Sequence, residues 1–317
     1  MTPFTSRRSQ SVASQGERRL IGEIKRWLGA ACPRSPFGIG DDCAVLPGSR
    51  RPALVTTDPV IFGQHFDAAV PPRAVGAKLL TRNLSDIAAM GGKPVAAVVS
   101  LALAPDTSLA WLQQFYRGLA ACALRFGVRI VGGDITQAPA GFFGAFLTLH
   151  GNVTTRRVIT RAGARRGDRI LVTGPLGGSR LGHHHRFTPR LAEGAWLARR
   201  PEVVAMMDIS DGLAKDLADL TPAGLAPSLS AAAIPVSLAA RQAARRSGRS
   251  PLDHALGDGE DYELLVVVRG DPQRLATAWR RRFGGKRLFL IGSFVRPADL
   301  PVDAIPLRDY HGYEHLR

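Results

Sequence analysis

Acidic side chains are scarce over the first two-thirds of the chain. Only five acids lie between residues 28 and 105, and only two lie between residues 107 and 192. Most of them occur in apolar or glycine-rich phrases: GIGDDCAVL, TTDPVIFGQHFD, NLSDIAAMGG, VGGDIT and MMDISDGLAKDL. A carboxylate among apolar groups is costly unless it is paired or binds a metal. If several of these groups converge, they form a hard-cation site, for which Mg²⁺ is the best candidate.

Cysteine is scarce too, and long apolar runs are missing. Cys32, Cys43 and Cys122 are odd in number and far apart, which excludes a disulfide framework and a CxxC zinc site. No apolar run approaches the ~18 residues of a membrane span, and the first residues lack the apolar core of a secretory signal. We expect a cytoplasmic protein that does not bind membranes, with residues 1–16 forming a disordered basic extension.

The shortage of acids leaves a strongly basic chain. Lys and Arg outnumber Asp and Glu by 42 to 26, for a formal charge of +16. Such a balance raises the question of nucleic-acid binding. The arginines are scattered in pairs and form no stripe interleaved with aromatic residues, so we expect a solvated basic surface and no nucleic-acid partner. A positive field also helps to gather anionic substrates.

At 317 residues and 45% hydrophobic content, the chain is long enough for two domains. Leu20, Ile24 and Trp27 fall on one face of a first helix. Further helices are predicted over 75–92, 108–127, 211–220, 236–248 and 271–284, and strands over 53–57, 94–104, 128–134, 141–153, 168–174, 204–210, 228–235 and 260–268. A basic, glycine-containing stretch after residue 152 marks the domain boundary. Neither half carries the dinucleotide or P-loop fingerprint, so a nucleotide would be held in another way.

Five phrases carry the candidate ligands. Asp41 and Asp42 follow a flexible Gly38-Ile39-Gly40 turn, and Thr56, Thr57 and Asp58 end a strand; both sets supply oxygen atoms that suit Mg²⁺ and phosphate. Alone, the first phrase also fits an ordinary Asp-rich turn.

The other three phrases are harder to explain as surface. Asp86 lies in a helix that is apolar on most sides, and Gly132-Gly133-Asp134 follows an apolar strand, where glycines let the backbone approach phosphates. Asp208, Ser210 and Asp211 join a strand to a helix, and a helix N-cap is the alternative role for the last two.

The order of these phrases resembles the thiamine-monophosphate kinase family. The resemblance rests on GIGDDCAVL, TTDPVIFGQHF, KLLTRNLSDIAAMGGKP, GGDITQAP, ITRAGARRGDRILVTG, DISDGLAKDL, GDGEDYELL and YHGYEH, and it covers the chain from about residue 17 to its end. It implies a mixed α/β (α+β), two-domain fold like that of aminoimidazole ribonucleotide synthetase. The N-terminal domain (17–152) would hold the metal and ATP site and form a homodimer, and the C-terminal α/β domain (153–317) would close the active site.

The resemblance also implies a role for each matching position. The implied magnesium ligands are Asp42, Thr56, Thr57, Asp58, Asp86, Asp134, Asp208 and Asp211. The positions implied to contact ATP are Gly133, Asp134, Arg161 and Ser210. The positions implied to contact thiamine monophosphate are His65, Glu260 and Tyr310. The implied reaction is the ATP- and Mg²⁺-dependent phosphorylation of thiamine monophosphate to thiamine diphosphate, the last step of thiamine diphosphate biosynthesis.

This chemistry agrees with the residues themselves. Phosphoryl transfer brings two polyanions together, so several divalent ions must screen their repulsion. Arg161 can neutralise phosphate oxygens through its fork of donors. No general base is evident, and an ionised acceptor phosphate needs none, which favours direct in-line transfer.

The chain departs from the family at three places. Tyr310 stands where a Trp is usual, and it either stacks on thiamine or packs the C-terminal segment on the second domain. The segment around His183, His184 and His185 is short, and we expect no metal there because adjacent side chains point apart. Asp258 replaces a usual Gly and would either contact or disturb the substrate.

Two other functions compete with the kinase. One is another enzyme of the superfamily, such as a synthetase that activates a carbonyl oxygen or a selenophosphate synthetase, although Cys32 lacks the glycine-rich setting expected of the latter. The other is a non-catalytic binding protein. Retention of so many costly carboxylates argues against it.

Overall fold

The computed structural model describes residues 1–34, 37–39, 44, 46 and 48–313. Asp41, Asp42 and Cys43 lie outside the described residues. The chain forms two compact units, which are considered separately: the first unit comprises residues 1–87 and 93–153, and the second comprises residues 88–92 and 154–317.

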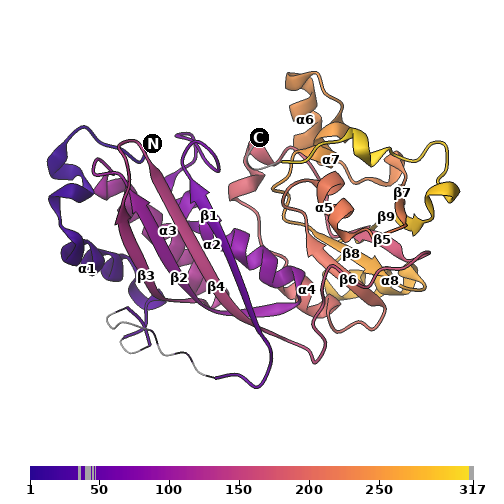
Figure 1. Ribbon diagram of the computed structural model, residues 1–317, viewed down its shortest axis with the longest axis horizontal. Coiled ribbons are helices and arrows are strands. Elements are labelled where there is room, and N and C mark those ends of the chain that lie inside the picture. Colours follow the sequence, from indigo (N-terminus) through magenta and orange to yellow (C-terminus); the bar gives the residue numbers. More distant parts are fainter. Residues whose placement is uncertain (35–36, 40–43, 45, 47, 314–317) are drawn as a thin grey trace. The chain divides into compact units, whose positions relative to one another are not determined.

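A four-stranded sheet forms the centre of the first unit (Figure 1). Its strands are β1 (Ala53–Ile61), β2 (Gly92–Leu103), β3 (Arg129–Gln137) and β4 (Phe143–Val153), in the order β1-β4-β2-β3. β1 pairs antiparallel with β4, and β2 pairs parallel with β3. Along β2 and β4, buried and exposed residues alternate, as expected for a sheet covered on one face.

Helices α2 (Pro72–Ala89) and α3 (Leu109–Phe126) cover that buried face (Figure 1), and α1 (Glu17–Leu28) packs on α3. Two glycines allow α2 and α3 to approach closely. A Cβ on Gly76 would lie 1.9 Å from the carbonyl oxygen of Phe115, and one on Gly118 would lie 1.9 Å from that of Arg73. The buried face of α1 includes Leu20, Ile24 and Trp27, which confirms the first predicted helix.

The structure places the first residues in contact with the rest of the first unit, whereas the sequence predicts a disordered extension. Phe4 bridges to Thr107 and Ser11 to Ser108 as short antiparallel pairs. The Phe4 ring meets the Phe62 ring edge to face, with centroids 5.5 Å apart. These contacts hold the segment, which is polar enough to read as disordered from composition alone.

The second unit contains a five-stranded sheet that is covered on both faces. Its strands are β5 (Arg169–Val172), β6 (Val203–Asp208), β7 (Ala226–Leu229), β8 (Leu264–Val268) and β9 (Phe289–Val295), in the order β6-β8-β5-β9-β7. Along β8, Leu265 and Val267 face one core, whereas Leu264 and Val266 face the other. Burial on both faces explains why this strand is a continuous apolar run.

Helices from different parts of the chain supply the two cores. α5 (Leu213–Leu220) and α7 (Pro251–Gly257) pack on one face of the sheet, and α4 (Leu191–Leu197) and α8 (Pro272–Arg282) pack on the other. α6 (Leu238–Ser247) packs on α7. The helices α4 and α7 and the strand β9 had no counterpart in the sequence pattern. In the part of the chain that the structure describes, no helix is both long and apolar enough to span a membrane.

Candidate functional site

β1 and α2 bring two predicted ligands of the first unit together. The Thr56 hydroxyl donates a hydrogen bond to Oδ2 of Asp86, and both residues are partly buried. Thr56 lies on the helix-covered face of the sheet. Asp86 lies near the end of α2, one residue before Ile87, where the first stretch of this unit ends. The pair presents hydroxyl and carboxylate oxygens at one place, which is a donor set that Mg²⁺ accepts.

Asp58 is held by a cation that the sequence argument did not single out. Arg82 lies one helical turn before Asp86, and its guanidinium is 3.3 Å from Oδ1 of Asp58. Arg82 also donates to the Pro59 carbonyl, at 2.7 Å. Thr56 with Asp86 and Asp58 with Arg82 therefore form two successive links between β1 and α2. The i, i+4 spacing of Arg82 and Asp86 in TRNLSD would have suggested a pair within the helix, so the sequence offered no signal for the contact of Arg82 with Asp58.

Thr57 points to the other side of the sheet. Its hydroxyl accepts a hydrogen bond from Thr148 of β4 at 3.3 Å, on the face that α2 and α3 do not cover. Successive side chains of a strand alternate between faces. Within the first unit, Thr57 is thus separated from the Thr56–Asp86 pair by the sheet itself.

Gly133 and Asp134 lie on β3, at the opposite edge of the sheet from β1. Three strand spacings separate the two edges, about 14 Å. A Cβ on Gly133 would lie 2.0 Å from the carbonyl oxygen of Val99 on β2, so close strand packing explains this glycine without any ligand. Asp134 is exposed. The structure does not bring Asp134 to the Thr56–Asp86 pair within this unit.

His65 is fixed in a turn after β1. Its Nδ1 accepts a hydrogen bond from the Ile61 backbone N–H at 3.1 Å, so the ring proton of neutral His65 is on Nε2. The His65 carbonyl accepts a hydrogen bond from Nζ of Lys78, at 2.7 Å, and Lys78 is fully buried. Lys78 is a further polar residue of α2 that the sequence argument did not single out.

The phrase Asp208-Ile209-Ser210-Asp211-Gly212 joins β6 to α5 in the second unit. Oδ2 of Asp216 accepts hydrogen bonds from the backbone N–H groups of Ser210, Asp211 and Gly212, at 2.9, 3.1 and 3.1 Å. Burial raises the pKa of Asp216 to about 8, with help from the nearby carboxylates of Asp208 and Asp211 and against the pull of these backbone donors. Asp216 therefore caps this turn, the task that the sequence alternative gave to Ser210 or Asp211.

The carboxylates of Asp208 and Asp211 lie beside that turn, and their oxygens are of the kind that bind metal ions. Asp208 is buried at the end of β6, and Oδ2 of Asp211 is 2.7 Å from Nζ of Lys215, one turn along α5. The segment Tyr310–Tyr313 lies against the same turn. The Tyr313 N–H donates to the Asp211 carbonyl at 2.9 Å, and Lys215 donates to the Tyr313 carbonyl at 2.6 Å.

Tyr310 is partly buried and packs on the core that contains α5 and α7. This contact fits the packing alternative for Tyr310. Its ring also remains partly accessible, so the stacking role stays a prediction.

Glu260 lies on a loop that runs beside the same turn. Its N–H donates to the Ser210 carbonyl at 2.7 Å, and the Tyr262 N–H donates to the Ile209 carbonyl at 2.8 Å. Glu260 and Tyr262 have φ angles of 54° and 51°, the only positive values among the described residues other than glycine. Such backbone angles are costly and are typically retained at functional sites.

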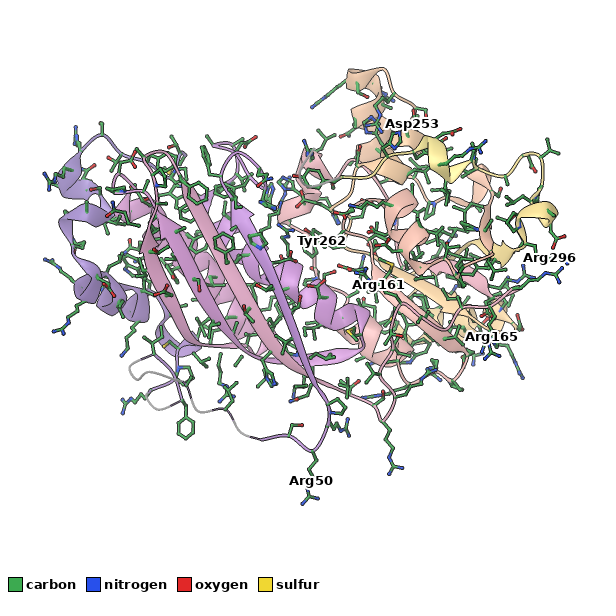
Figure 2. The ribbon with its side chains drawn as sticks, in the orientation of Figure 1. Arg50, Arg161, Arg165, Asp253, Tyr262 and Arg296 are labelled. Carbon is green, nitrogen blue, oxygen red and sulfur yellow. The ribbon has the colours of Figure 1, made fainter. Side chains whose placement is uncertain are left out.

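Arg161, labelled in Figure 2, is an exposed residue of the second unit. Its guanidinium is 3.5 Å from Asp219 of α5, and both side chains are more than half exposed. The residue before it, Thr160, accepts a hydrogen bond from the N–H of Met206 on β6. A pair this exposed contributes little to stability, so Arg161 keeps its donors available to a ligand at low cost.

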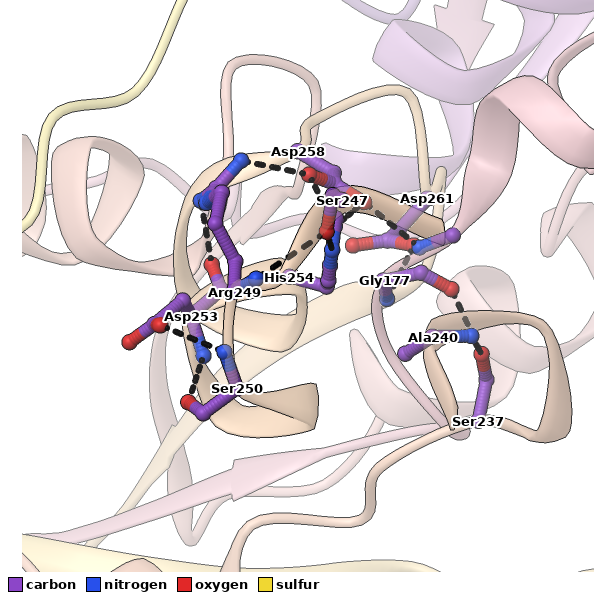
Figure 3. A network of polar contacts seen from close by, with 11 residues as sticks. Gly177, Ser237, Ala240, Ser247, Arg249, Ser250, Asp253, His254, Asp258 and Asp261 are labelled. Atoms are coloured by element: carbon purple, nitrogen blue, oxygen red, sulfur yellow. Dashed lines mark hydrogen bonds and ion pairs between the residues drawn. The ribbon is translucent and has the colours of Figure 1, made fainter. Parts of the chain in front are cut away.

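Asp258 has a structural role (Figure 3). Its carboxylate accepts from the Gly178 N–H at 2.9 Å, meets Nδ1 of His254 at 2.9 Å and pairs with Arg249 at 3.5 Å. Nε2 of His254 is 2.7 Å from the Ser247 hydroxyl. These contacts connect the end of α6 to α7. A cavity of about 350 Å³ lies next to them, and its lining includes Asp258 and Tyr313.

The carboxylate and hydroxyl oxygens described above are ligand types that Mg²⁺ accepts. Among the described residues, no group of three or more His, Cys, Asp or Glu side chains is arranged to hold a metal by itself. Mg²⁺ is usually bound through one or two carboxylates together with substrate phosphates and water, not in a protein cage. Pairs such as Thr56–Asp86, and Asp208 with Asp211, match that pattern.

Comparison with known proteins defines first the class and then the family. The family model for "AIR synthase related protein, N-terminal domain" matches residues 40–153. Thiamine-monophosphate kinase of Rhodopirellula baltica is 39% identical over 74% of this chain and 77% of its own length. That of Escherichia coli is 34% identical over 73% and 76%. The chain belongs to the thiamine-monophosphate kinase family.

Solved structures agree with this assignment. The crystal structure of thiamine-monophosphate kinase from Stenotrophomonas maltophilia has a TM-score of 0.73 and 29% identity, covering 87% of this chain and 93% of that one. A structure described as AaThiL complexed with AMPPCP and TMP has a TM-score of 0.66 and 29% identity, covering 98% and 99%. The predicted mixed α/β fold, like that of aminoimidazole ribonucleotide synthetase, is confirmed.

Proposed function

We propose that the protein phosphorylates thiamine monophosphate to thiamine diphosphate, with ATP as phosphoryl donor and several Mg²⁺ ions, in the last step of thiamine diphosphate biosynthesis. The observation that carries this proposal is the solved relative in complex with AMPPCP and TMP, which matches nearly the whole chain. Curated relatives with the same activity in their names support it.

The residues of the first unit would serve the metal ions. Asp86, supported by Thr56, and Asp58, oriented by Arg82, would supply carboxylate oxygens. Asp134 on β3 is assigned to the metal ions from the family pattern alone. We assign Thr57 and Asp42 to the same task from the family pattern. When bound, Mg²⁺ would screen the repulsion between the two substrates and stabilise charge on the transferred group.

The remaining assignments concern the two substrates. Asp208 and Asp211 would add metal ligands, and Ser210, Gly133 and Arg161 would contact ATP. Arg161 neutralises phosphate oxygens through its fork of donors. His65, Glu260 and Tyr310 would contact thiamine monophosphate, with the His65 ring oriented by the hydrogen bond that its Nδ1 accepts from the Ile61 N–H.

The reaction itself is direct in-line transfer. The acceptor phosphate is ionised near neutral pH, so it is the nucleophile and no side chain has to remove a proton. The protein's task is to position two phosphates and to supply charge where it develops.

A second copy of the chain is the proposed partner. The face of the first sheet that the helices leave open carries Val55, Val98 and Phe146, all of them exposed in the single chain. An apolar face of this kind is expected to be covered, and a homodimer would cover it.

Cys32 and Cys122 are free thiols, which is compatible with a cytoplasmic location.

Substrate choice tests the function. Purified protein is incubated with ATP and Mg²⁺ together with either thiamine monophosphate or free thiamine, and products are separated by chromatography. We expect thiamine diphosphate from the first and no phosphorylation of the second, because free thiamine presents an alcohol that needs a base. Equal turnover of free thiamine would contradict the mechanism, and no turnover of either would contradict the function.

A further inference from the structure

The loop around Glu260 is held in a strained shape by a neighbouring segment. Glu260 and Tyr262 both have positive φ angles, which ordinary residues avoid because the side chain crowds the backbone. The Tyr262 hydroxyl donates to Oε1 of Glu260 at 3.3 Å. Tyr262 is almost completely buried, so its side chain has little freedom and its hydroxyl holds a fixed position next to the Glu260 carboxylate.

The segment is the short stretch from Gly182 to Phe187, and it contacts the three consecutive loop residues. Nε2 of His183 is 3.0 Å from the Asp261 carbonyl oxygen. Nδ1 of His184 is 3.6 Å from Oε2 of Glu260. The Phe187 ring stacks on the Tyr262 ring, with centroids 4.0 Å apart and planes 14° apart.

His184 lies near Oε2 of Glu260, whereas Tyr262 donates to Oε1. The other ring nitrogen of His184, Nε2, is 3.0 Å from Nδ1 of His185, and the two rings are nearly perpendicular. A bond between two ring nitrogens needs one proton. When His185 donates it, the remaining proton of neutral His184 is on Nδ1 and faces Glu260.

We propose that His184 is a positioning residue that orients the Glu260 carboxylate for thiamine monophosphate. The inference rests on the proposed function, in which Glu260 contacts that substrate. The Tyr262 hydroxyl donates to one oxygen, and the His184 ring lies 3.6 Å from the other, so the carboxylate has few rotamers. An acceptor oriented in advance loses less freedom on binding.

Two substitutions separate orientation from packing. In His184→Asn, the amide nitrogen falls where Nδ1 was and can still donate to Glu260. In His184→Leu, a side chain of similar bulk has no donor. We expect His184→Leu to raise the KM for thiamine monophosphate severalfold, up to about tenfold, because the Glu260 carboxylate loses the polar ring that orients it, while the KM for ATP stays within about twofold. His184→Asn should restore most of the affinity.

A double-mutant cycle links the effect to its partner. In a Glu260→Gln background, His184→Leu should add little further loss, because the charge that it orients is gone. If His184→Asn and His184→Leu are equally impaired, or if both substrates and the melting temperature change in parallel, His184 has only a structural role and the proposal fails.

A measurement without turnover distinguishes this inference from the kinase assignment. The His184 ring is titrated by NMR, and His184→Asn identifies its signal. A carboxylate nearby raises the pKa of an imidazole, so Glu260→Gln should move the titration of the His184 ring to lower pH. An unchanged pKa would overturn the inference even in an active kinase. A lowered pKa in a protein that does not phosphorylate thiamine monophosphate would overturn the proposed function instead.

Discussion

The Thr56 hydroxyl on β1 donates a hydrogen bond to the Asp86 carboxylate on α2, thirty positions along the chain. The contact joins two predicted metal ligands and leaves the second carboxylate oxygen of Asp86 outside this bond. A carboxylate oriented in this way is a ligand type that Mg²⁺ accepts. The same strand and helix are linked again by Asp58 and Arg82.

We predict that Asp86→Asn lowers kcat/KM about 100-fold, because it keeps the shape of the side chain but removes a charge that faces the metal. The loss should be partly recovered at high Mg²⁺. Kinetics across a Mg²⁺ series give the answer, with Asp303→Asn, the same substitution in an exposed loop, as the matched control. Unchanged turnover in stable Asp86→Asn protein would remove Asp86 from the metal site.

A second prediction concerns stability. The buried carboxylate of Glu263 forms a bidentate ion pair with the partly buried Arg190, and the Thr173 hydroxyl donates to the same carboxylate at 2.6 Å. Glu263→Gln should cost about 3 kcal/mol in free energy of unfolding, because it leaves the partly buried Arg190 guanidinium without its main charged partner. Urea denaturation measures this.

The exposed pair of Arg296 and Asp299 is the control for that experiment (Figure 2). Asp299→Asn should leave the stability nearly unchanged, since exposed pairs are worth little. Similar losses in both variants would show that burial is not what makes the Arg190–Glu263 pair important.

The third prediction is a pH dependence. Burial raises the pKa of Asp261 well above its usual range, although the Gly177 N–H donates to the carboxyl at 2.8 Å. The folded protein therefore holds this proton more tightly than the unfolded chain does. Stability from this group is greatest below about pH 4, the unfolded value, and is lost as the pH rises toward the folded pKa.

Asp261→Asn removes that titration while keeping an oxygen for the Gly177 N–H. We expect the fall in unfolding free energy as the pH rises above about 4, the unfolded pKa, to be shallower in the variant. Thermal or urea melts across the pH series, in metal-free buffer, compare the two slopes. Parallel slopes would mean that Asp261 is ionised in the folded protein.

Tyr310 gives the fourth prediction. If its ring stacks on thiamine, Tyr310→Ala should raise the KM for thiamine monophosphate by about tenfold, for a loss of ~1–2 kcal/mol, and leave the KM for ATP nearly unchanged. Tyr310→Trp should preserve or tighten binding. Because Tyr310 also packs on the core, the alanine variant should melt earlier. Equal changes in both KM values would assign Tyr310 to packing alone.

The sequence predicted most strands and helices because their apolar periodicity is strong. The continuous run of β8 and the amphipathic α1 are examples. It missed α4 and α7, each seven residues long, since so short a segment shows barely two turns of periodicity. It also missed the ordering of the first residues, which depends on ring and backbone contacts with residues about 100 positions away.

For the candidate site, sequence phrases identified the carboxylates but not their partners. Arg82, Lys78 and Asp216 hold Asp58, His65 and the Ser210–Gly212 turn, and each partnership depends on where a helix lies against a strand or loop. The strain at Glu260 could not be foreseen either, because glutamate rarely adopts a positive φ. Motifs indicate the kind of chemistry, and tertiary contacts decide how each group is oriented.

The central claim is tested most directly by following the γ-phosphate of ATP. Purified protein is given γ-labelled ATP, Mg²⁺ and thiamine monophosphate, and the label is traced in the separated products, with EDTA as the parallel control. We expect labelled thiamine diphosphate in equal amount to ADP, and none with EDTA. ADP with free labelled phosphate but no labelled thiamine diphosphate would contradict it.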